Sequence, residues 1–372
     1  MNILILSWRS PKHPNAGGAE RVTLEHAKAW IGKGHLVYWF SSNFKGARNS
    51  ETIDGVKVVR KGGYVAGVRI RAFFWYLFAK HPKFDLVIDQ FHGLPFFTPF
   101  YVRVRKLAFI HEIAGEVWRL NPWKKPFNII PSIFGTYLEP YIFRLFYRKI
   151  PFLTVSESTR DDLVKWGIPR GNITIIHNGV NLDLPKEKFT KENKLTAIYL
   201  GAISEDKGTK EAVLAFAEID RKDDLWQFWI VGPGTMDIVS ELKKLAQELG
   251  IGEKVVFWGY VSDKKKFELL MRSHILVNPS VHEGWGLVNI EANACGLPVI
   301  AYNVHGIKDS VRDGKTGILV DKHDYKSLAE NTLKLLKDVQ KYKKFQENAK
   351  KWSSRFSWEK ATKESLELIE SI

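Results

Sequence analysis

The sequence of 372 residues contains a single cysteine, Cys295, so no disulfide can form within the chain. A chain without disulfides fits a reducing compartment. No apolar run approaches the roughly 20 residues that a helix needs to cross a bilayer. The short apolar run at residues 3–6 is typical of a strand rather than of a signal sequence. We therefore expect a cytoplasmic protein that meets a membrane, if at all, peripherally at its inner face.

Several metal and cofactor motifs are also missing. The chain has no Asp-x-Asp pair to hold a divalent metal on a nucleotide diphosphate, and no His, Cys, Asp and Glu cluster with zinc spacing. It also lacks the Gly-x-Gly-x-x-Gly fingerprint of nicotinamide dehydrogenases. We expect no metal and no other cofactor.

Acidic residues are too few to balance the basic ones, and the net charge is +15. Nucleic acid, an anionic membrane surface or an anionic substrate would each favour such a charge. Short basic clusters interleaved with aromatic residues occur at 101–106, 121–127 and 143–149. This pattern is closer to an interfacial surface than to a nucleic-acid-binding tail, so we expect no nucleic acid. A solvated basic face is the alternative reading.

Strand and helix signals alternate along the chain, which predicts parallel sheets covered by helices on both faces. Residues 113–150 interrupt the pattern with irregular, aromatic-rich sequence, and the alternation restarts after residue 180. The sequence therefore predicts an α/β fold with two Rossmann-like, doubly wound parallel sheets facing a cleft. The expected parts are a first Rossmann-like domain (1–181), a second Rossmann-like domain (182–353) and a C-terminal helix that packs back on the first domain (354–372). Strands are expected at 1–7, 36–40, 56–60, 86–89, 107–110, 152–155, 195–201, 226–232, 255–258, 275–278, 298–302 and 317–320.

Polar residues and glycines gather where these strands end. Gly17 and Gly18 precede a helix and would let the backbone approach a phosphate or sugar, although glycine pairs also make ordinary turns. Lys207 lies near a helix start, where a lysine can meet a diphosphate or remain a solvated surface charge. His111 follows the strand at 107–110 and could hydrogen-bond a sugar hydroxyl, shuttle a proton or be structural.

The stretch EGWGLVNIEANACGLPVI at 283–300 is the most informative. If a helix begins near Gly286, Glu283 lies in the loop before it and Glu291 lies just over one turn inside it. The free N–H groups of the first turn then face a gap that both carboxylates border. Amides suit phosphate oxygens and carboxylates suit hydroxyls, so the arrangement favours a polyol phosphate ligand.

Together these residues resemble the retaining glycosyltransferases of family 4, which have the GT-B fold. The strongest similarity covers residues 283–320, with the E-x7-E motif and the Gly-x-Pro-Val-Ile and Gly-x-x-Gly-x-Leu-Val stretches that follow it. Residues 17–20, 156–181 and 199–208 match in order, so the resemblance spans nearly the whole chain.

The resemblance implies a nucleotide-diphosphate sugar as donor and a glycan or lipid-linked acceptor, with hexosyl transfer and retention of configuration. It implies catalytic roles for Glu283, His111 and Lys207: Glu283 would contact the transferred sugar, His111 would lie beside it, and Lys207 would hold the diphosphate. The donor would also be bound by the ribose contact of Glu291, by the amides of Gly286 and Leu287, and by Gly17 and Gly18, with the base along 257–261.

One position departs from the family pattern, because Ala202 stands where an arginine is usual. Arg9 or Lys12 could compensate. Two rival functions stay open: a sugar-nucleotide epimerase of the same fold, and a non-catalytic binding protein for sugar nucleotides or nucleic acid.

Overall fold

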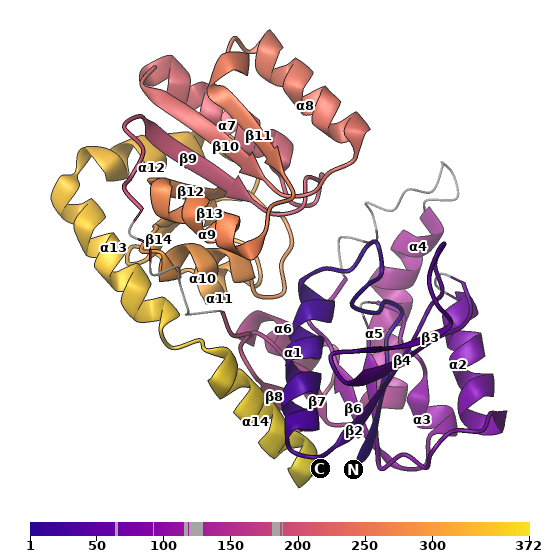
Figure 1. Cartoon of the computed structure of the whole chain (residues 1–372). Helices are drawn as coiled ribbons and strands as arrows, with labels where there is room; N and C mark the ends of the chain where they lie inside the picture. The colour runs from indigo at the N-terminus through magenta and orange to yellow at the C-terminus, as the bar shows by residue number, and fades with distance from the viewer. Residues whose placement is uncertain (64–65, 92, 115–117, 119–128, 181–186, 188) are drawn as a thin grey trace. The chain divides into compact units, whose positions relative to one another are not determined.

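The structure is a computed structural model that describes residues 1–372 except 64–65, 92, 115–117, 119–128, 181–186 and 188 (Figure 1). The chain divides into two compact units. Unit 1 comprises Met1–Gly179 and Trp358–Ile372, and unit 2 comprises Val180–Ser357. Each unit is built on its own sheet and has its own hydrophobic core.

Unit 1 contains a sheet of eight strands among the described residues, in the order β3-β4-β2-β1-β5-β6-β7-β8. All neighbours pair in parallel except β3 and β4, which pair antiparallel at the edge. The strands are β1 (Asn2–Leu6), β2 (Leu36–Ser41), β3 (Ser50–Ile53), β4 (Val56–Arg60), β5 (Leu86–Gln90), β6 (Arg105–Phe109), β7 (Phe152–Thr154) and β8 (Ile173–Ile175).

The helices of unit 1 differ from expectation in one region. Residues 129–147, expected to be irregular, form an almost continuous helical segment that alternates α and π turns. The helices are α1 (Gly18–Gly32), α2 (Ala66–Phe78), α3 (Thr98–Tyr101), α4 (Ile129–Ile133), η2 (Phe134–Leu138), α5 (Glu139–Ile142), η3 (Phe143–Tyr147), α6 (Glu157–Lys165), η4 (Arg170–Asn172) and α14 (Trp358–Ser371).

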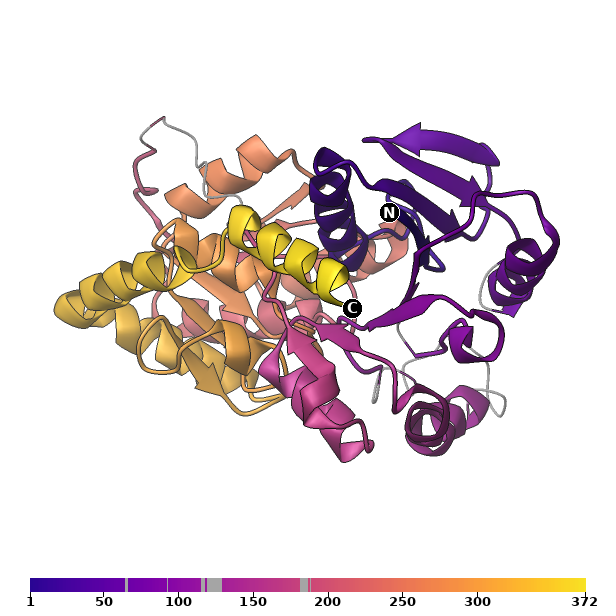
Figure 2. The same ribbon diagram turned by 90° about the horizontal axis from the view of Figure 1, so that it is seen from below.

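The last helix, α14, belongs to unit 1 although the whole of unit 2 precedes it in the chain. It lies along α1, as both ribbon views show (Figures 1 and 2). The indole Nε1 of Trp30 on α1 donates a hydrogen bond of 3.1 Å to Ser365 Oγ on α14. This buried contact ties the end of the chain to the first helix.

Unit 2 contains a parallel sheet in the order β11-β10-β9-β12-β13-β14. Its strands are β9 (Leu195–Leu200), β10 (Trp226–Val231), β11 (Val255–Gly259), β12 (Ile275–Asn278), β13 (Val299–Tyr302) and β14 (Gly317–Val320). Apolar side chains occupy most positions of the central strands, because helices cover both faces of the sheet.

Two groups of helices pack within unit 2: α12 packs against α7 and α7 against α8, whereas α10 packs against α13 (Figure 1). The helices are α7 (Thr209–Lys222), α8 (Met236–Glu248), η5 (Gly252–Lys254), α9 (Asp263–Arg272), α10 (Leu287–Ala294), α11 (Ile307–Ser310), α12 (Tyr325–Lys337) and α13 (Val339–Ser353). The fold is thus α/β with two doubly wound sheets, and the antiparallel edge strand β3 departs from the prediction of parallel sheets.

Candidate active site

The strand order of unit 2 reverses between β9 and β12, which are neighbours in the sheet. Strands added after β9 lie on one side of this point, and those from β12 onward lie on the other. Sheets of this kind bind ligands outside the carboxyl ends of the strands at such a switch point. The two segments that leave it are residues 201–208 and 279–286, and they carry Lys207 and Glu283.

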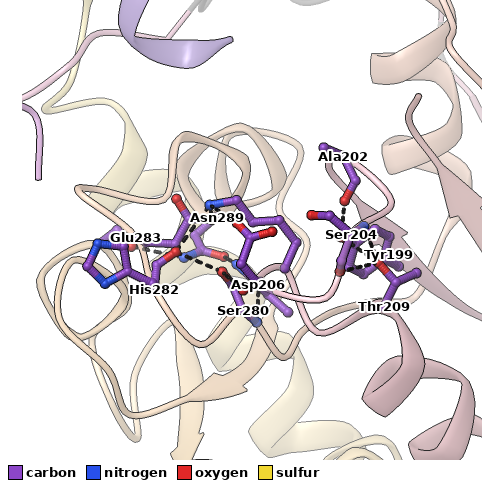
Figure 3. Close-up of polar contacts among 12 residues, drawn as sticks. Tyr199, Ala202, Ser204, Asp206, Thr209, Ser280, His282, Glu283 and Asn289 are labelled. Carbon is purple, nitrogen blue, oxygen red and sulfur yellow. Dashed lines mark hydrogen bonds and ion pairs between the residues drawn. The ribbon is translucent and has the colours of Figure 1, made fainter. Parts of the chain in front are cut away.

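Hydrogen bonds hold these two segments together (Figure 3). The backbone carbonyl of Asp206 accepts from the Val281 amide at 3.0 Å and from Ser280 Oγ at 3.4 Å. Lys207 Nζ donates to the His282 carbonyl at 3.1 Å. The switch point therefore carries an ordered arrangement of polar groups.

Lys207 and Glu283 form an ion pair of 3.0 Å between Nζ and Oε1. Their side chains are 26% and 19% exposed, so both groups are partly accessible to solvent. The motif that contains Lys207 and the motif that contains Glu283 thus meet at the switch point. A partly exposed pair of this kind can exchange its partner for a ligand at modest cost.

Helix α10 begins at Leu287, one residue from the predicted start. Its N-cap, Gly286, has φ +74°, a conformation that favours glycine. A Cβ at that position would lie 2.6 Å from Asn289 Nδ2. Asn289 donates to Ser310 Oγ at 2.9 Å and accepts from Asn278 Nδ2 at 2.7 Å, so buried side chains fix the start of the helix. Its first amides therefore have a defined direction.

Glu291 lies inside α10 and forms a second ion pair. Its Oε1 is 2.6 Å from Lys266 Nζ on α9, and each side chain is 10% exposed. Lys266 also contacts Asp263 Oδ1 at 2.9 Å. Lys266 was not predicted from the sequence, because it lies in a run of three lysines at 264–266 that is typical of a solvated helix start. Glu283 and Glu291 are thus each paired with a lysine.

Ala202, at the position of the usual arginine, contributes its backbone rather than a side chain to the structure. Its carbonyl accepts from Tyr199 Oη at 2.6 Å, and Thr209 Oγ1 donates to the same hydroxyl at 3.1 Å (Figure 3). The two cations considered as substitutes are engaged within unit 1. Arg9 pairs with Glu20 at 2.8 Å, and Lys12 pairs with Glu51 at 2.8 Å.

The candidate residues of unit 1 lie near the carboxyl ends of its strands. Gly18 begins α1, and Gly17 is its N-cap, with its amide donating to Glu20 Oε2 at 2.8 Å. Gly17 has an extended backbone, and no heavy atom lies within 4 Å of where a Cβ would stand. Neither conformation nor packing therefore requires glycine there, which leaves room beside the backbone for a ligand.

His111 is buried, with its ring against that of Phe109 at a centroid distance of 4.2 Å. Its Nε2 lies 3.5 Å from Thr23 Oγ1 and 3.4 Å from Gln90 Nε2. These polar neighbours come from α1 and β5, so they hold the imidazole in one orientation.

Some features of the sequence analysis fall outside the described residues, including Trp123, Lys124 and Lys125 of the basic–aromatic clusters. Among the described residues, no group of three or more His, Cys, Asp or Glu side chains is arranged to hold a metal ion. In the same part of the chain, no helix combines the length and the apolar character needed to cross a membrane.

Comparisons with known proteins identify the family. The family model "Glycosyltransferase Family 4" matches residues 16–184, and the model "Glycosyl transferases group 1" matches residues 181–352. The two matches adjoin, and each covers one Rossmann-like half. The chain belongs to glycosyltransferase family 4.

Two curated relatives of this family 4 chain are named for different glycosyltransferase activities. The D-inositol 3-phosphate glycosyltransferase 2 of Catenulispora acidiphila is 30% identical over 220 residues, covering 55% of this chain and 52% of the relative. The capsular polysaccharide biosynthesis glycosyltransferase CapM of Staphylococcus aureus is 30% identical over 227 residues, covering 56% and 59%. The chain thus spans about half the length of the curated relatives it matches.

Solved structures match the family 4 chain over its whole length. Sucrose-phosphate synthase of Thermosynechococcus elongatus has a TM-score of 0.79 at 20% identity, covering 100% of this chain and 98% of the other. HepE of Anabaena, solved with UDP and glucose, has a TM-score of 0.75 at 19% identity and covers 100% of both chains. These similarities establish the GT-B fold.

Proposed function

We propose that the protein is a retaining glycosyltransferase that moves a hexose from a nucleotide-diphosphate sugar to a glycan or lipid-linked acceptor. The observation that carries this proposal is the ion pair between Lys207 and Glu283 at the switch point of unit 2, next to the start of α10. Family membership supports the reaction class. The UDP bound to HepE supports a nucleotide donor by analogy of fold.

The proposed chemistry is stabilisation of a leaving group. When the bond between sugar and diphosphate breaks, negative charge grows on the phosphate and positive charge on the sugar. Lys207 Nζ and the first amides of α10, including that of Leu287, would stabilise the phosphate where its charge develops. The departing phosphate would take the proton of the acceptor hydroxyl, so no protein general base is assigned.

The two glutamates would bind different parts of the donor. Glu283, in the loop before α10, would accept hydrogen bonds from sugar hydroxyls once the donor replaces it as the partner of Lys207. Glu291, held by Lys266, would accept from the ribose hydroxyls. From unit 1, the backbone at Gly17 and Gly18 would line the sugar-phosphate site, and His111 would lie beside the sugar.

An assay of nucleotide release with and without acceptor tests this proposal. A transferase releases the nucleoside diphosphate only when the acceptor is present. Release or isomerisation of the sugar nucleotide without acceptor would instead identify a hydrolase or an epimerase, and binding without turnover would identify a binding protein. The donor can be found beforehand with a thermal-shift panel of UDP, GDP and ADP sugars, since a ligand stabilises the state that binds it.

For the acceptor, a surface of unit 1 favours peripheral binding to an anionic membrane. Helix α2 exposes large apolar side chains, among them Phe74 (52%) and Phe78 (75%). Ring contacts connect this helix through α3 to η3: Phe73 meets Tyr101 at 5.1 Å, and Phe100 meets Phe146 at 4.6 Å. We call this surface of α2, α3 and η3 the α2–η3 face. Further exposed apolar side chains on α2 and on the helical segment 129–147 are Ile70, Leu77, Ile129, Ile130, Ile133, Tyr137, Leu138, Tyr141 and Leu145.

Basic residues are exposed on and next to the α2–η3 face, namely Arg71, Arg103, Arg144, Arg148 and Lys149. Each basic residue near an anionic membrane contributes about 1 kcal/mol to binding, so several suffice without a spanning helix. The prediction was wrong for Phe143, which was expected at the membrane interface. It is fully buried in the core, where its ring centroid lies 5.3 Å from that of Phe91.

Sedimentation with liposomes tests the membrane contact. The protein should pellet with anionic vesicles at low salt and less so at high salt, and it should not pellet with neutral ones. The double variant Phe74→Ser/Phe78→Ser should weaken pelleting, whereas Met236→Ser, which removes an apolar side chain 88% exposed in unit 2, serves as the control. If the wild-type protein stays in the supernatant with both vesicle types, a soluble glycan acceptor becomes the better proposal.

A further inference from the structure

A polar pocket in unit 2 is lined by none of the residues assigned to the donor. It has a volume of about 780 Å³ and lies between the turn that precedes β14 and the end of α13. Because β14 begins at Gly317, the turn is at the amino end of its strand, whereas Lys207 and Glu283 follow the carboxyl ends of theirs. The pocket is lined by Arg312, Lys315, Thr316, Asn348, Lys351, Trp352, Ser354 and Arg355.

Trp352 organises the two guanidinium groups of this basic pocket. The Arg312 guanidinium carbon lies 4.2 Å from the centroid of the Trp352 ring, and that of Arg355 lies 5.0 Å from it. The indole Nε1 donates to the Ser310 carbonyl at 2.8 Å, which fixes the ring. Stacking on an anchored ring lowers the freedom of each arginine, so the guanidinium groups are pre-organised to bind a ligand.

The charges of the basic pocket are not balanced by acidic side chains. Its lining includes no carboxylate, and none of its four cations has a carboxylate partner among the described residues. Asp313 is adjacent in sequence to Arg312, but its Oδ1 accepts from the Leu319 amide at 2.9 Å. Four like charges that converge on one cavity repel one another, and a bound anion would remove that cost.

A purely structural role accounts for only half of the basic pocket. Lys351 and Arg355 lie at the carboxyl end of α13, where cations stabilise the helix dipole. Arg312 and Lys315 come from a separate turn some 40 residues earlier. They are not part of α13, so stabilisation of its dipole does not explain why they occur there. Their convergence on the same cavity is therefore explained better by a ligand.

We propose that the basic pocket binds a phosphorylated ligand at a site separate from the donor site. Guanidinium groups bind phosphate oxygens in pairs, and the two lysines add point charges that suit a phosphate monoester or a diphosphate. The phosphate could belong to a free phosphorylated compound or to a phospholipid headgroup, which share this chemistry.

Calorimetry with inorganic pyrophosphate tests the site, using full-length protein that carries Lys207→Ala to weaken binding at the donor site. We expect pyrophosphate to bind this protein, and we expect Arg312→Gln/Arg355→Gln to weaken the binding by at least about tenfold. Lys343→Gln/Lys344→Gln removes the same charge from exposed positions of α13 outside the pocket and should leave the affinity unchanged. Equal affinity in the pocket and control variants, or no binding to begin with, would overturn the proposal.

A second double variant tests the pocket without disturbing the packing around Trp352. Lys315→Gln/Lys351→Gln keeps both arginines that stack on Trp352 and should also weaken pyrophosphate binding. Vesicles that contain phosphatidic acid, compared with neutral phosphatidylcholine vesicles, distinguish the two sources of phosphate. Pocket variants that lose vesicle binding as well as pyrophosphate indicate a headgroup, and variants that lose only pyrophosphate indicate a free ligand.

Discussion

The buried pair of Glu291 and Lys266 allows the ligand role of a glutamate to be separated from its structural role. Glu291→Gln keeps the shape of the side chain and removes its charge. Breaking a buried ion pair costs about 3–5 kcal/mol when the remaining charge has no partner. Here Lys266 keeps Asp263, 2.9 Å away and 58% exposed, so we expect the free energy of unfolding to fall by only about 1–3 kcal/mol.

The affinity for the nucleotide should fall independently of stability. If Glu291 accepts hydrogen bonds from the ribose, the variant loses about 1–3 kcal/mol of binding free energy, which is about 5- to 150-fold in Kd. Isothermal titration with the nucleoside diphosphate that most stabilises the wild-type protein measures this loss. Chemical denaturation of the same samples measures the cost in stability.

The double variant Lys266→Met/Glu291→Leu completes the test. Replacing both partners of a buried pair by apolar side chains is often neutral, so stability should recover while nucleotide affinity stays low. Glu268→Gln on the same helix α9 is the control, because it weakens two more exposed pairs, with Lys265 and Arg272, and should change neither quantity by more than about 1 kcal/mol. Wild-type nucleotide affinity in the double variant would refute the ribose contact and leave Glu291 a structural residue.

Three further predictions follow from the site and from one buried histidine. Glu283→Gln should abolish sugar transfer while nucleotide affinity survives, because its proposed partner is the sugar; near-wild-type turnover would contradict that role. Turnover should persist in EDTA, and a complete loss that Mg²⁺ or Mn²⁺ restores would contradict metal-independent transfer. Burial lowers the pKa of His26 from 6.5 to about 4, so the unfolded state binds more protons than the folded state between these pH values. The free energy of unfolding should therefore fall as the pH drops from about 6.5 to about 4, by at most about 3 kcal/mol. Thermal melts of His26→Phe should show a smaller fall than the wild-type protein, and an equal fall would exclude His26 as the cause.

Much of the fold was predictable because its central strands are continuous apolar runs. β4, β12 and β14 have the predicted bounds, and eight further strands agree within one residue at each end, namely β1, β2, β5, β7, β9, β10, β11 and β13. Two strands were missed, and both lie at an edge of the first sheet. β3 has the sequence Ser-Glu-Thr-Ile, in which a single residue is buried, so it carries no apolar run to recognise. β8 is only three residues long.

The helical segment 129–147 was missed for a different reason. Aromatic and apolar residues occur around much of its circumference, and many are exposed, so the sequence lacks the polar face by which a surface helix is recognised. At the site, the motif spacing predicted the start of α10 and the loop position of Glu283. It could not predict Lys266, because a lysine in a lysine-rich helix start becomes an ion-pair partner only through the packing of α9 against its neighbours.

The return of α14 to unit 1 means that unit 2 is, in covalent terms, an insertion within unit 1. The chain leaves unit 1 after Gly179 and re-enters it at Trp358, and the two crossing segments are hydrogen-bonded to each other, with the Val180 amide donating to the Phe356 carbonyl at 2.9 Å. During synthesis, unit 2 can therefore fold before unit 1 has received its last helix. Until residues 358–372 are synthesised, the face of α1 that carries Trp30 stays uncovered, so unit 1 cannot complete its packing before the whole of unit 2 has been made.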